Sequence, residues 1–147
     1  MFSEKKLIKL AKQKQKTIVL PEAGYSDRIV EAGYILNKKK IAKVILLGDE
    51  SSLVLRYKDK LKGLTIINPK TSALFDELLK ILLEKRKNKG LDQKQAEKLL
   101  LNPLYFGTLL VEAGYADGMV AGAEEPSSNV IRPALQILKS KDEKEIV

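Results

Sequence analysis

Residues 117–138 read Asp-Gly-Met-Val-Ala-Gly-Ala-Glu-Glu-Pro-Ser-Ser-Asn-Val-Ile-Arg-Pro-Ala-Leu-Gln-Ile-Leu, and this stretch decides the expected fold. The short apolar run at residues 119–121 lies between Gly118 and Gly122, which is typical of a buried strand. A polar loop at residues 124–128 follows, and apolar residues then recur with the spacing of an amphipathic helix. The stretch therefore predicts a strand, a loop and a helix in succession, the unit from which parallel sheets are built.

The loop between this strand and this helix is the first candidate binding site. Open α/β sheets bind ligands where a strand ends and the next helix begins. Ser127, Ser128 or Asn129 is expected to cap the helix, and free backbone N–H groups with the helix dipole favour an anion there. Arg132 falls near the first turn, where the dipole alone would favour an acid. It is therefore either an anion ligand or a plain surface side chain.

Composition limits the chemistry available to the chain. Its 147 residues, 44% of them hydrophobic, fit one globular domain. No apolar run reaches the ~20 residues that a membrane span needs, and the first residues lack the apolar core of a signal peptide. The chain has no Cys and no His, which excludes disulfides, thiol nucleophiles, imidazole bases and ordinary zinc sites. We expect a cytoplasmic protein with no bound metal.

The formal net charge of +8 raises the question of nucleic-acid binding, which we do not favour. Aromatic residues make up 5% of the chain and do not alternate with basic ones, as a base-stacking surface would require. A lysine-rich solvated surface accounts for the charge better. Among 27 cationic residues only four are arginine, namely Arg28, Arg56, Arg86 and Arg132. These four are candidates for sites that need the planar, two-pronged guanidinium group.

Strands and helices are expected to alternate along the chain. Continuous apolar runs, typical of buried strands, occur at residues 17–20, 42–47, 64–67 and 119–121. Amphipathic patterns predict helices near residues 3–15, 27–40, 51–57, 71–90, 92–101, 104–113 and 129–138. Ser3 and Asp92 are expected as caps, Gly90 as a stop and Pro103 at a first helical position. This order predicts an α/β fold, a three-layer sandwich with a mostly parallel sheet and helices on both faces. Residues 145–147 resemble the start of a further strand, so we expect the chain to be part of a longer protein.

With these elements laid out, the chain resembles the N-terminal part of the phosphate acetyl/butyryl transferase family. Seven motifs, in the same order along nearly the whole chain, carry the resemblance. They are Thr17-Ile-Val-Leu-Pro-Glu22 with Asp27-Arg28, Ala42-Lys-Val-Ile-Leu-Leu-Gly48, Ile67-Asn-Pro-Lys70, Glu84-Lys-Arg-Lys-Asn-Lys-Gly90, Asn102-Pro-Leu-Tyr-Phe-Gly-Thr108, Ala116-Asp-Gly-Met-Val-Ala-Gly122 and Val130-Ile-Arg-Pro-Ala-Leu-Gln-Ile137. The run at residues 102–108 favours the acetyl branch of the family.

The resemblance implies an acyltransferase that moves an acetyl group between coenzyme A and inorganic phosphate, giving acetyl phosphate. It implies a two-domain α/β protein with the active site between the domains, a homodimer, and coenzyme A as a substrate rather than a bound cofactor. It also implies that Arg132 and Arg86 help to bind coenzyme A and that Arg28 lies near the same region. We add Ser127, Ser128 and Asn129 of the adjoining loop to this candidate binding set.

Two departures from the family pattern lead to further expectations. The family's catalytic Ser, Arg and Asp belong to its C-terminal half, so we expect residues 1–147 to be an N-terminal α/β domain without catalytic residues and inactive alone. The alternative is a non-catalytic module of this fold that binds anions or nucleotides. Relatives also commonly read Gly-Ala-x-His-Ser-Thr-x-Asp in the loop, where Glu124, Glu125 and Pro126 stand here. Two carboxylates would repel an anionic substrate, so we expect them to point to solvent; otherwise the site is altered.

Overall fold

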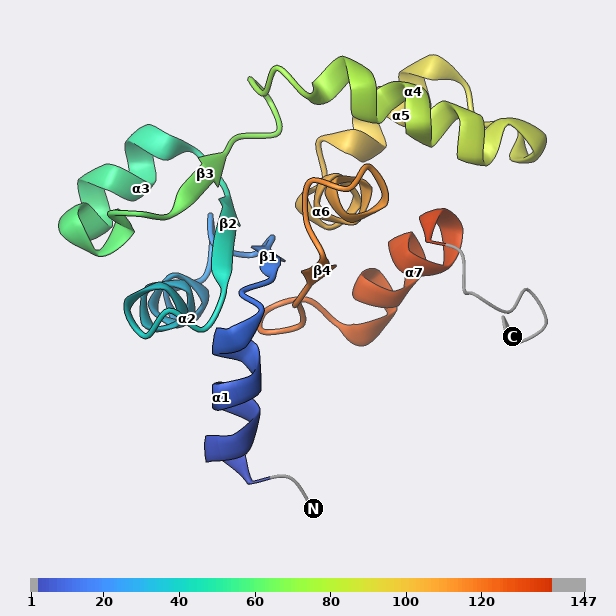
Figure 1. The fold of residues 1–147 in the computed structure, drawn as a ribbon. Helices are drawn as coiled ribbons and strands as arrows, with labels where there is room; N and C mark the ends of the chain where they lie inside the picture. The colour runs from blue at the N-terminus through green and yellow to red at the C-terminus, as the bar shows by residue number, and fades with distance from the viewer. Residues whose placement is uncertain (1–2, 139–147) are drawn as a thin grey trace.

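The centre of the structure, a computed structural model that describes residues 3–138, is a parallel sheet (Figure 1). Its four strands are β1 (Thr17–Leu20), β2 (Lys43–Leu47), β3 (Thr65–Ile67) and β4 (Gly118–Met119). They lie in the order β3-β2-β1-β4, and every pair is parallel. β1 is therefore central, with Ile18 opposite Gly118 on β4 although 100 positions separate them. The predicted parallel sheet is confirmed.

Helices cover both faces of this sheet, as the three-layer prediction requires (Figure 1). On one face lie α2 (Asp27–Lys38), α3 (Glu50–Tyr57) and the 3-10 turn η1 (Lys58–Leu61). On the other lie α4 (Phe75–Arg86), η2 (Lys87–Lys89), α5 (Gln93–Leu100), α6 (Pro103–Glu112) and α7 (Ser127–Ile137). Two apolar cores result, because neighbouring strand residues point to opposite faces. Leu20 and Leu46 enter one core, and Val19 and Leu47 enter the other.

The helix α6 is the buried element of the larger core. All seven residues from Leu104 to Leu110 are buried, so this helix is apolar around its whole surface. Asn102 caps it through a hydrogen bond to the backbone N–H of Leu104, and Pro103 occupies the first helical position. Gly107 faces the sheet so closely that a Cβ atom there would lie 2.8 Å from the sulfur of Met119. The absent side chain thus lets the helix lie directly on β1 and β4.

Several predicted boundaries needed correction. The helix expected from residue 71 begins at Phe75, because residues 68–74 form turns in which the Ser72 hydroxyl accepts from the backbone N–H of Leu74. The strand expected at residues 119–121 is Gly118–Met119, and Val120 is exposed where the chain turns away. The stop at Gly90, with φ +71°, and the cap at Asp92 are confirmed. The further strand expected at residues 145–147 lies outside the described residues.

The first helix, α1 (Glu4–Gln13), extends away from the sheet (Figure 1). Ser3 caps it as predicted, by accepting from the backbone N–H of Lys6. None of its own residues is buried, and Leu7 and Leu10 stand about half exposed at 52% and 47%. Within residues 3–138 no helix has the length and apolar character needed to cross a membrane.

Candidate functional site

The loops that follow β1 and β4 meet at the carboxyl end of the sheet. The strands β1, β2 and β3 progress to one side, whereas β4 lies on the other side of β1. The sheet order therefore reverses between β1 and β4, and open α/β sheets bind their ligands outside the strand ends at such a reversal. Residues 21–26 follow β1 there, and residues 120–126 follow β4.

The gap between these two loops is filled by a side chain of the protein itself. Glu22, which is fully buried, accepts four hydrogen bonds from consecutive backbone N–H groups. One carboxylate oxygen accepts from Gly122 at 2.6 Å and Ala123 at 3.1 Å. The other accepts from Glu124 at 2.6 Å and Glu125 at 2.9 Å. Burial alone would raise the pKa of Glu22, but these N–H donors outweigh it and lower the pKa below its ordinary value.

This arrangement corrects the expectation of free N–H groups in the loop. The four donors that would have faced an external anion are already paired with the Glu22 carboxylate. The expected capping residues are also corrected, since Ser127, Ser128 and Asn129 form the first turn of α7 rather than its cap. Pro126 holds the N-cap position in an extended conformation and makes no side-chain capping bond. Sequence reasoning missed Glu22 as a site residue, since a Glu after a strand carries no distinctive pattern.

Both acidic residues of the loop are bonded to neighbouring side chains. Arg28 donates to the carbonyl oxygen of Ala123 at 2.5 Å and to Glu124 at 3.0 Å. The Ser26 hydroxyl donates to the same Glu124 oxygen at 3.0 Å. The bonds from Arg28, first, and from Ser26 lower the pKa of Glu124. Glu124 is exposed, as expected, with 40% of its side chain accessible, but its charge is paired with Arg28.

Glu125 joins the same contact between the loops. Its carboxylate accepts from the Tyr25 hydroxyl at 3.0 Å and from the Asn129 side-chain amide at 3.1 Å. Burial, followed by the bond to Glu125, raises the pKa of Tyr25. Glu125 is half-buried and bonded to these two side chains, so for this residue the expectation that it points to solvent is corrected. The Asn129 amide, a predicted ligand group, is directed at the protein's own carboxylate.

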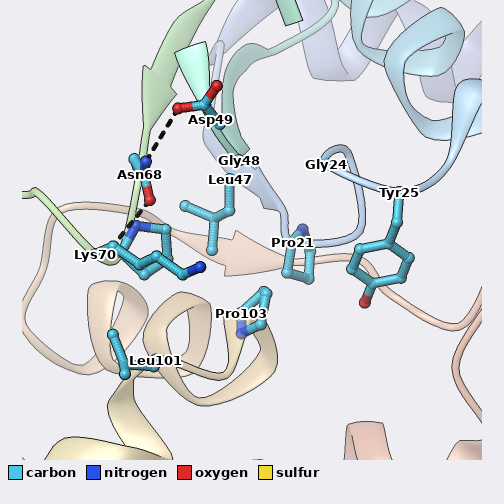
Figure 2. Close-up of a pocket in the computed structure, with 11 residues that line it drawn as sticks. Pro21, Gly24, Tyr25, Leu47, Gly48, Asp49, Asn68, Lys70, Leu101 and Pro103 are labelled. Carbon is cyan, nitrogen blue, oxygen red and sulfur yellow. Dashed lines mark hydrogen bonds between the residues drawn. The ribbon is translucent and has the colours of Figure 1, made fainter. Parts of the chain in front are cut away.

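A cavity of about 330 Å³ lies at the carboxyl ends of β1, β2 and β3 (Figure 2). Leu47, Leu101 and three prolines form much of its wall, with the polar side chains of Asp49, Asn68 and Lys70 along one side and Tyr25 on another. The lining residues are Pro21, Gly24, Tyr25, Leu47, Gly48, Asp49, Asn68, Pro69, Lys70, Leu101 and Pro103. None of the predicted binding residues lines this cavity. Its only indication in the sequence is the Gly, Pro and Asn residues that end successive strands.

The polar side chains of Asp49 and Asn68 are hydrogen-bonded to one another and to nearby residues. Asp49 caps α3 by accepting from the backbone N–H and the hydroxyl of Ser52, and these bonds lower the pKa of Asp49. The Asn68 amide contacts Asp49 at 3.5 Å, and the Asn68 oxygen accepts from the backbone N–H of Lys70 at 3.0 Å. Lys70 is exposed, and its positively charged side chain lies at the cavity beside the apolar lining residues.

Two of the four arginines, Arg86 on α4 and Arg132 on α7, act electrostatically on one tyrosine of α6. Tyr105 on α6 is buried and donates to Gln136 on α7 at 2.9 Å. Burial raises the pKa of Tyr105, while the positive charges of Arg132 and Arg86 act in the opposite direction. Two arginines from different helices thus lie within electrostatic reach of one phenol.

The four arginines differ in their partners. Arg28 pairs with Glu124, and Arg56 pairs with Asp27 at 3.1 Å. In the part of the chain that the structure describes, neither Arg86 nor Arg132 forms an ion pair or a side-chain hydrogen bond. Arg132 is exposed and Arg86 is half-buried. The two therefore retain guanidinium groups that are available to an anion.

Ser127 and Ser128 lie exposed on the first turn of α7. Ser128 borders an open groove of about 460 Å³ along α7, together with Ile131, Arg132, Leu135 and Gln136. Most of the surface of this groove is apolar, with Ile131 and Leu135 about half exposed at 52% and 53%. Among residues 3–138, no three His, Cys, Asp or Glu side chains converge as a metal site would require.

Comparison with known proteins places this geometry in one family. A sequence model described as phosphate acetyl/butaryl transferase matches residues 2–147. The phosphate acetyltransferase of Helicobacter pylori is 43% identical over 141 residues, which cover 94% of this chain and 27% of that protein. The phosphate acetyltransferase of Acetivibrio thermocellus is 42% identical over 135 residues, covering 91% of this chain and 40% of that protein.

Solved structures agree with the sequence comparison. A phosphotransacetylase from Streptococcus pyogenes superposes with a TM-score of 0.83 at 35% identity, over 95% of this chain and 44% of that one. The EutD phosphotransacetylase from Staphylococcus aureus gives the same TM-score of 0.83 at 38% identity, over 96% and 44%. The chain thus spans less than half the length of these relatives. Because the family match extends over nearly all of its residues, the chain belongs to the phosphate acetyl/butaryl transferase family.

Proposed function

We propose that this chain is the coenzyme A-binding N-terminal portion of a phosphate acetyltransferase. The reaction transfers the acetyl group of acetyl-coenzyme A to inorganic phosphate, which gives acetyl phosphate and free coenzyme A. The names of the relatives support the reaction. The observation that carries the binding role is the pair Arg86 and Arg132, which lie near one phenol and have no acidic partner within residues 3–138.

The chemistry of coenzyme A suits this pair. The molecule carries a 3′-phosphate and a pyrophosphate, and a guanidinium group binds phosphate oxygens through two parallel hydrogen bonds. The two guanidinium groups lie on separate helices, so they can bind two different phosphate groups of coenzyme A or the same phosphate group from two sides. Arg28 was predicted to lie near the same ligand, but its hydrogen bonds go to Ala123 and Glu124. Its contribution is therefore to the loop that precedes α7, rather than to the ligand directly.

We further propose that the 147 residues do not catalyse acetyl transfer alone. Transfer to phosphate requires the thioester and the attacking oxygen to be held in register and the developing negative charge to be stabilised. A row of backbone N–H groups could have served that purpose, but Glu22 already occupies the row after β4. From the resemblance, we propose a cytoplasmic homodimer in which the catalytic groups come from beyond this domain. The family match does not favour the alternative of a non-catalytic module.

Titration calorimetry with coenzyme A and 3′-dephospho-coenzyme A tests the binding role. We expect the chain to bind coenzyme A, and Arg132→Ala and Arg86→Ala to weaken that binding. If an arginine grips the 3′-phosphate, its replacement weakens coenzyme A binding more than dephospho-coenzyme A binding. Absence of binding to either ligand would overturn the role. Formation of the thioester from acetyl phosphate and coenzyme A by the purified chain would overturn the proposal that it lacks catalytic groups.

A further inference from the structure

We propose that Glu22 is a positioning residue of the coenzyme A site, which holds the loop after β4 so that α7 presents Arg132 to the ligand. The proposal rests on the proposed function and adds to it a residue that makes no contact with the ligand. It starts from four hydrogen bonds, of 2.6 to 3.1 Å, between one buried carboxylate and four consecutive backbone N–H groups.

Only a carboxylate satisfies this row of donors. Each oxygen of Glu22 accepts two hydrogen bonds, so all four N–H groups of residues 122–125 are paired. A glutamine side chain has the same shape, but its NH₂ group is a donor and would face two of these N–H groups. A buried donor without an acceptor costs its full desolvation. A neutral residue at position 22 therefore forces the loop to change its conformation.

The loop transmits this restraint to α7 through a short path. Glu22 lies two residues after the end of β1, and β1 is held by strand pairing on both sides. The loop passes from Glu125 through Pro126 to Ser127, the first residue of α7. The second half of the helix is held separately, because Pro133 and Ile137 are buried and Gln136 accepts from Tyr105. Release of the near end would move the first half of the helix, up to Arg132, about this buried half.

Arg132 lies between these two anchors, which makes it sensitive to this movement. It stands five residues after the start of α7 and five before the end. Its side chain has no partner of its own within residues 3–138 to restore its position. The position of its guanidinium group therefore follows the position of the helix, and through it the bonds of Glu22.

A double-mutant cycle on coenzyme A binding tests this coupling. We expect Glu22→Gln to weaken binding to the 147-residue chain about five- to tenfold. In an Arg132→Ala background, the same substitution should cause no further loss, because the group that Glu22 positions is gone. Glu31→Gln, which removes a carboxylate paired with Lys60 on the surface, is the matched control and should leave the affinity unchanged. Equal losses from Glu22→Gln in both backgrounds would overturn the positioning role.

A second variant makes the test possible even if Glu22→Gln does not fold. A second measurement separates failure of the positioning role from failure of the proposed function. Glu22→Asp retains the charge on a shorter side chain and should recover part of the affinity; it also enters the cycle if Glu22→Gln does not fold. In ¹⁵N–¹H spectra, Glu22→Gln should shift the amides of residues 122–129 and the Nε–H signal of Arg132. A wild-type chain that binds no coenzyme A refutes the proposed function, whereas an unmoved Arg132 signal in Glu22→Gln refutes the positioning role.

Discussion

The guanidinium group of Arg28 and the carboxylate of Glu124 form an ion pair at 3.0 Å that joins the start of α2 to the loop after β4. The pair resolves a conflict in the sequence, where two acidic residues stand beside a proposed anion site. Arg28 neutralises one of them, and Tyr25 with Asn129 binds the other. The charge of Glu124 is therefore balanced beside the proposed anion site, and the residue that balances it is one that the family resemblance associated with the ligand.

The first prediction follows from this division of roles. Replacement of Arg28 by Ala should weaken coenzyme A binding less than about threefold, whereas Arg132→Ala should weaken it about tenfold or more. The reason is that the Arg28 guanidinium group already donates hydrogen bonds to Ala123 and Glu124. Calorimetric titration of both variants measures the difference. If Arg28→Ala weakened binding as much as Arg132→Ala, Arg28 would have to be assigned a direct contact with coenzyme A.

The second prediction concerns kinetics in the enzyme of full family length. Ala at Arg86 or Arg132 should raise the KM for coenzyme A more than that for acetyl phosphate. Each lost charge-assisted bond is worth ~1.5–3 kcal/mol, or roughly ten- to a hundredfold. Lys should restore only part, because it lacks the guanidinium fork. Arg56→Ala is the control, since Arg56 pairs with Asp27 on the opposite face of the sheet. Small and equal effects at all three positions would contradict the assignment.

The third prediction is a dependence of stability on pH that arises from Glu22. Its folded pKa lies below the ordinary value of 4.5, so its bonds stabilise the fold fully above pH 4.5 and lose this effect as pH falls through the folded pKa. At neutral pH, Glu22→Gln should lower the free energy of unfolding by about 2–3 kcal/mol. Urea unfolding of both proteins between pH 7 and 3 should show that difference shrinking below pH 4.5. A difference that stays constant would exclude the ionised carboxylate as its source.

The fourth prediction concerns the contact between α6 and the sheet. Gly107→Ala should lower the free energy of unfolding by roughly 1–3 kcal/mol, because the new methyl group would lie 2.8 Å from the Met119 sulfur and 3.2 Å from a Val19 methyl group. Gly33→Ala in α2 is the matched control. Its Cβ would meet the end of the Leu46 side chain at 3.1 Å, so the loss should be smaller. Denaturant melts compare the two, and equal effects would count against close packing as the cause.

The fifth prediction concerns self-association of the chain. Ile131 and Leu135 expose apolar surface along the groove on α7, so copies of the chain should associate as concentration rises. Replacement of both by Glu should shift sedimentation towards the monomer. Leu55→Glu offers a control, since Leu55 on α3 is 77% exposed but lies outside this groove. A wild-type chain that stays monomeric at all concentrations would contradict the expectation.

Much of the fold could be predicted because its determinants are local. Apolar runs placed β1, β2 and β3 within one residue of their observed bounds. Ser3 and Asp92 mark helix starts through contacts within three residues, and Pro103 marks one by its place at the first helical position. The expected start at residue 71 failed because Thr71 and Ser72 serve equally well in turns. The expected caps of α7 failed because Pro126 takes the N-cap position and the residues after it enter the helix.

The site could be predicted only in part, since its contacts are distant in sequence. The scarcity of arginine pointed to Arg86 and Arg132, which the structure brings near the same tyrosine; their role in binding stays a prediction. Glu22 could not be found in this way, because its four partners lie 100 to 103 positions along the chain. The cavity at the ends of β1, β2 and β3 likewise needs residues from four separate segments.

The central place of β1 has a consequence for how the chain folds during synthesis. Thr17 bonds to Asp117 in both directions, since its N–H donates to the carboxylate and its carbonyl accepts from the backbone N–H, each at 2.8 Å. One edge of β1 is paired early by β2, but the other waits until β4 has left the ribosome. Such long-range closure slows folding and exposes an unpaired edge in the nascent chain. Chaperone capture should therefore peak while residues 48–117 are emerging from the ribosome.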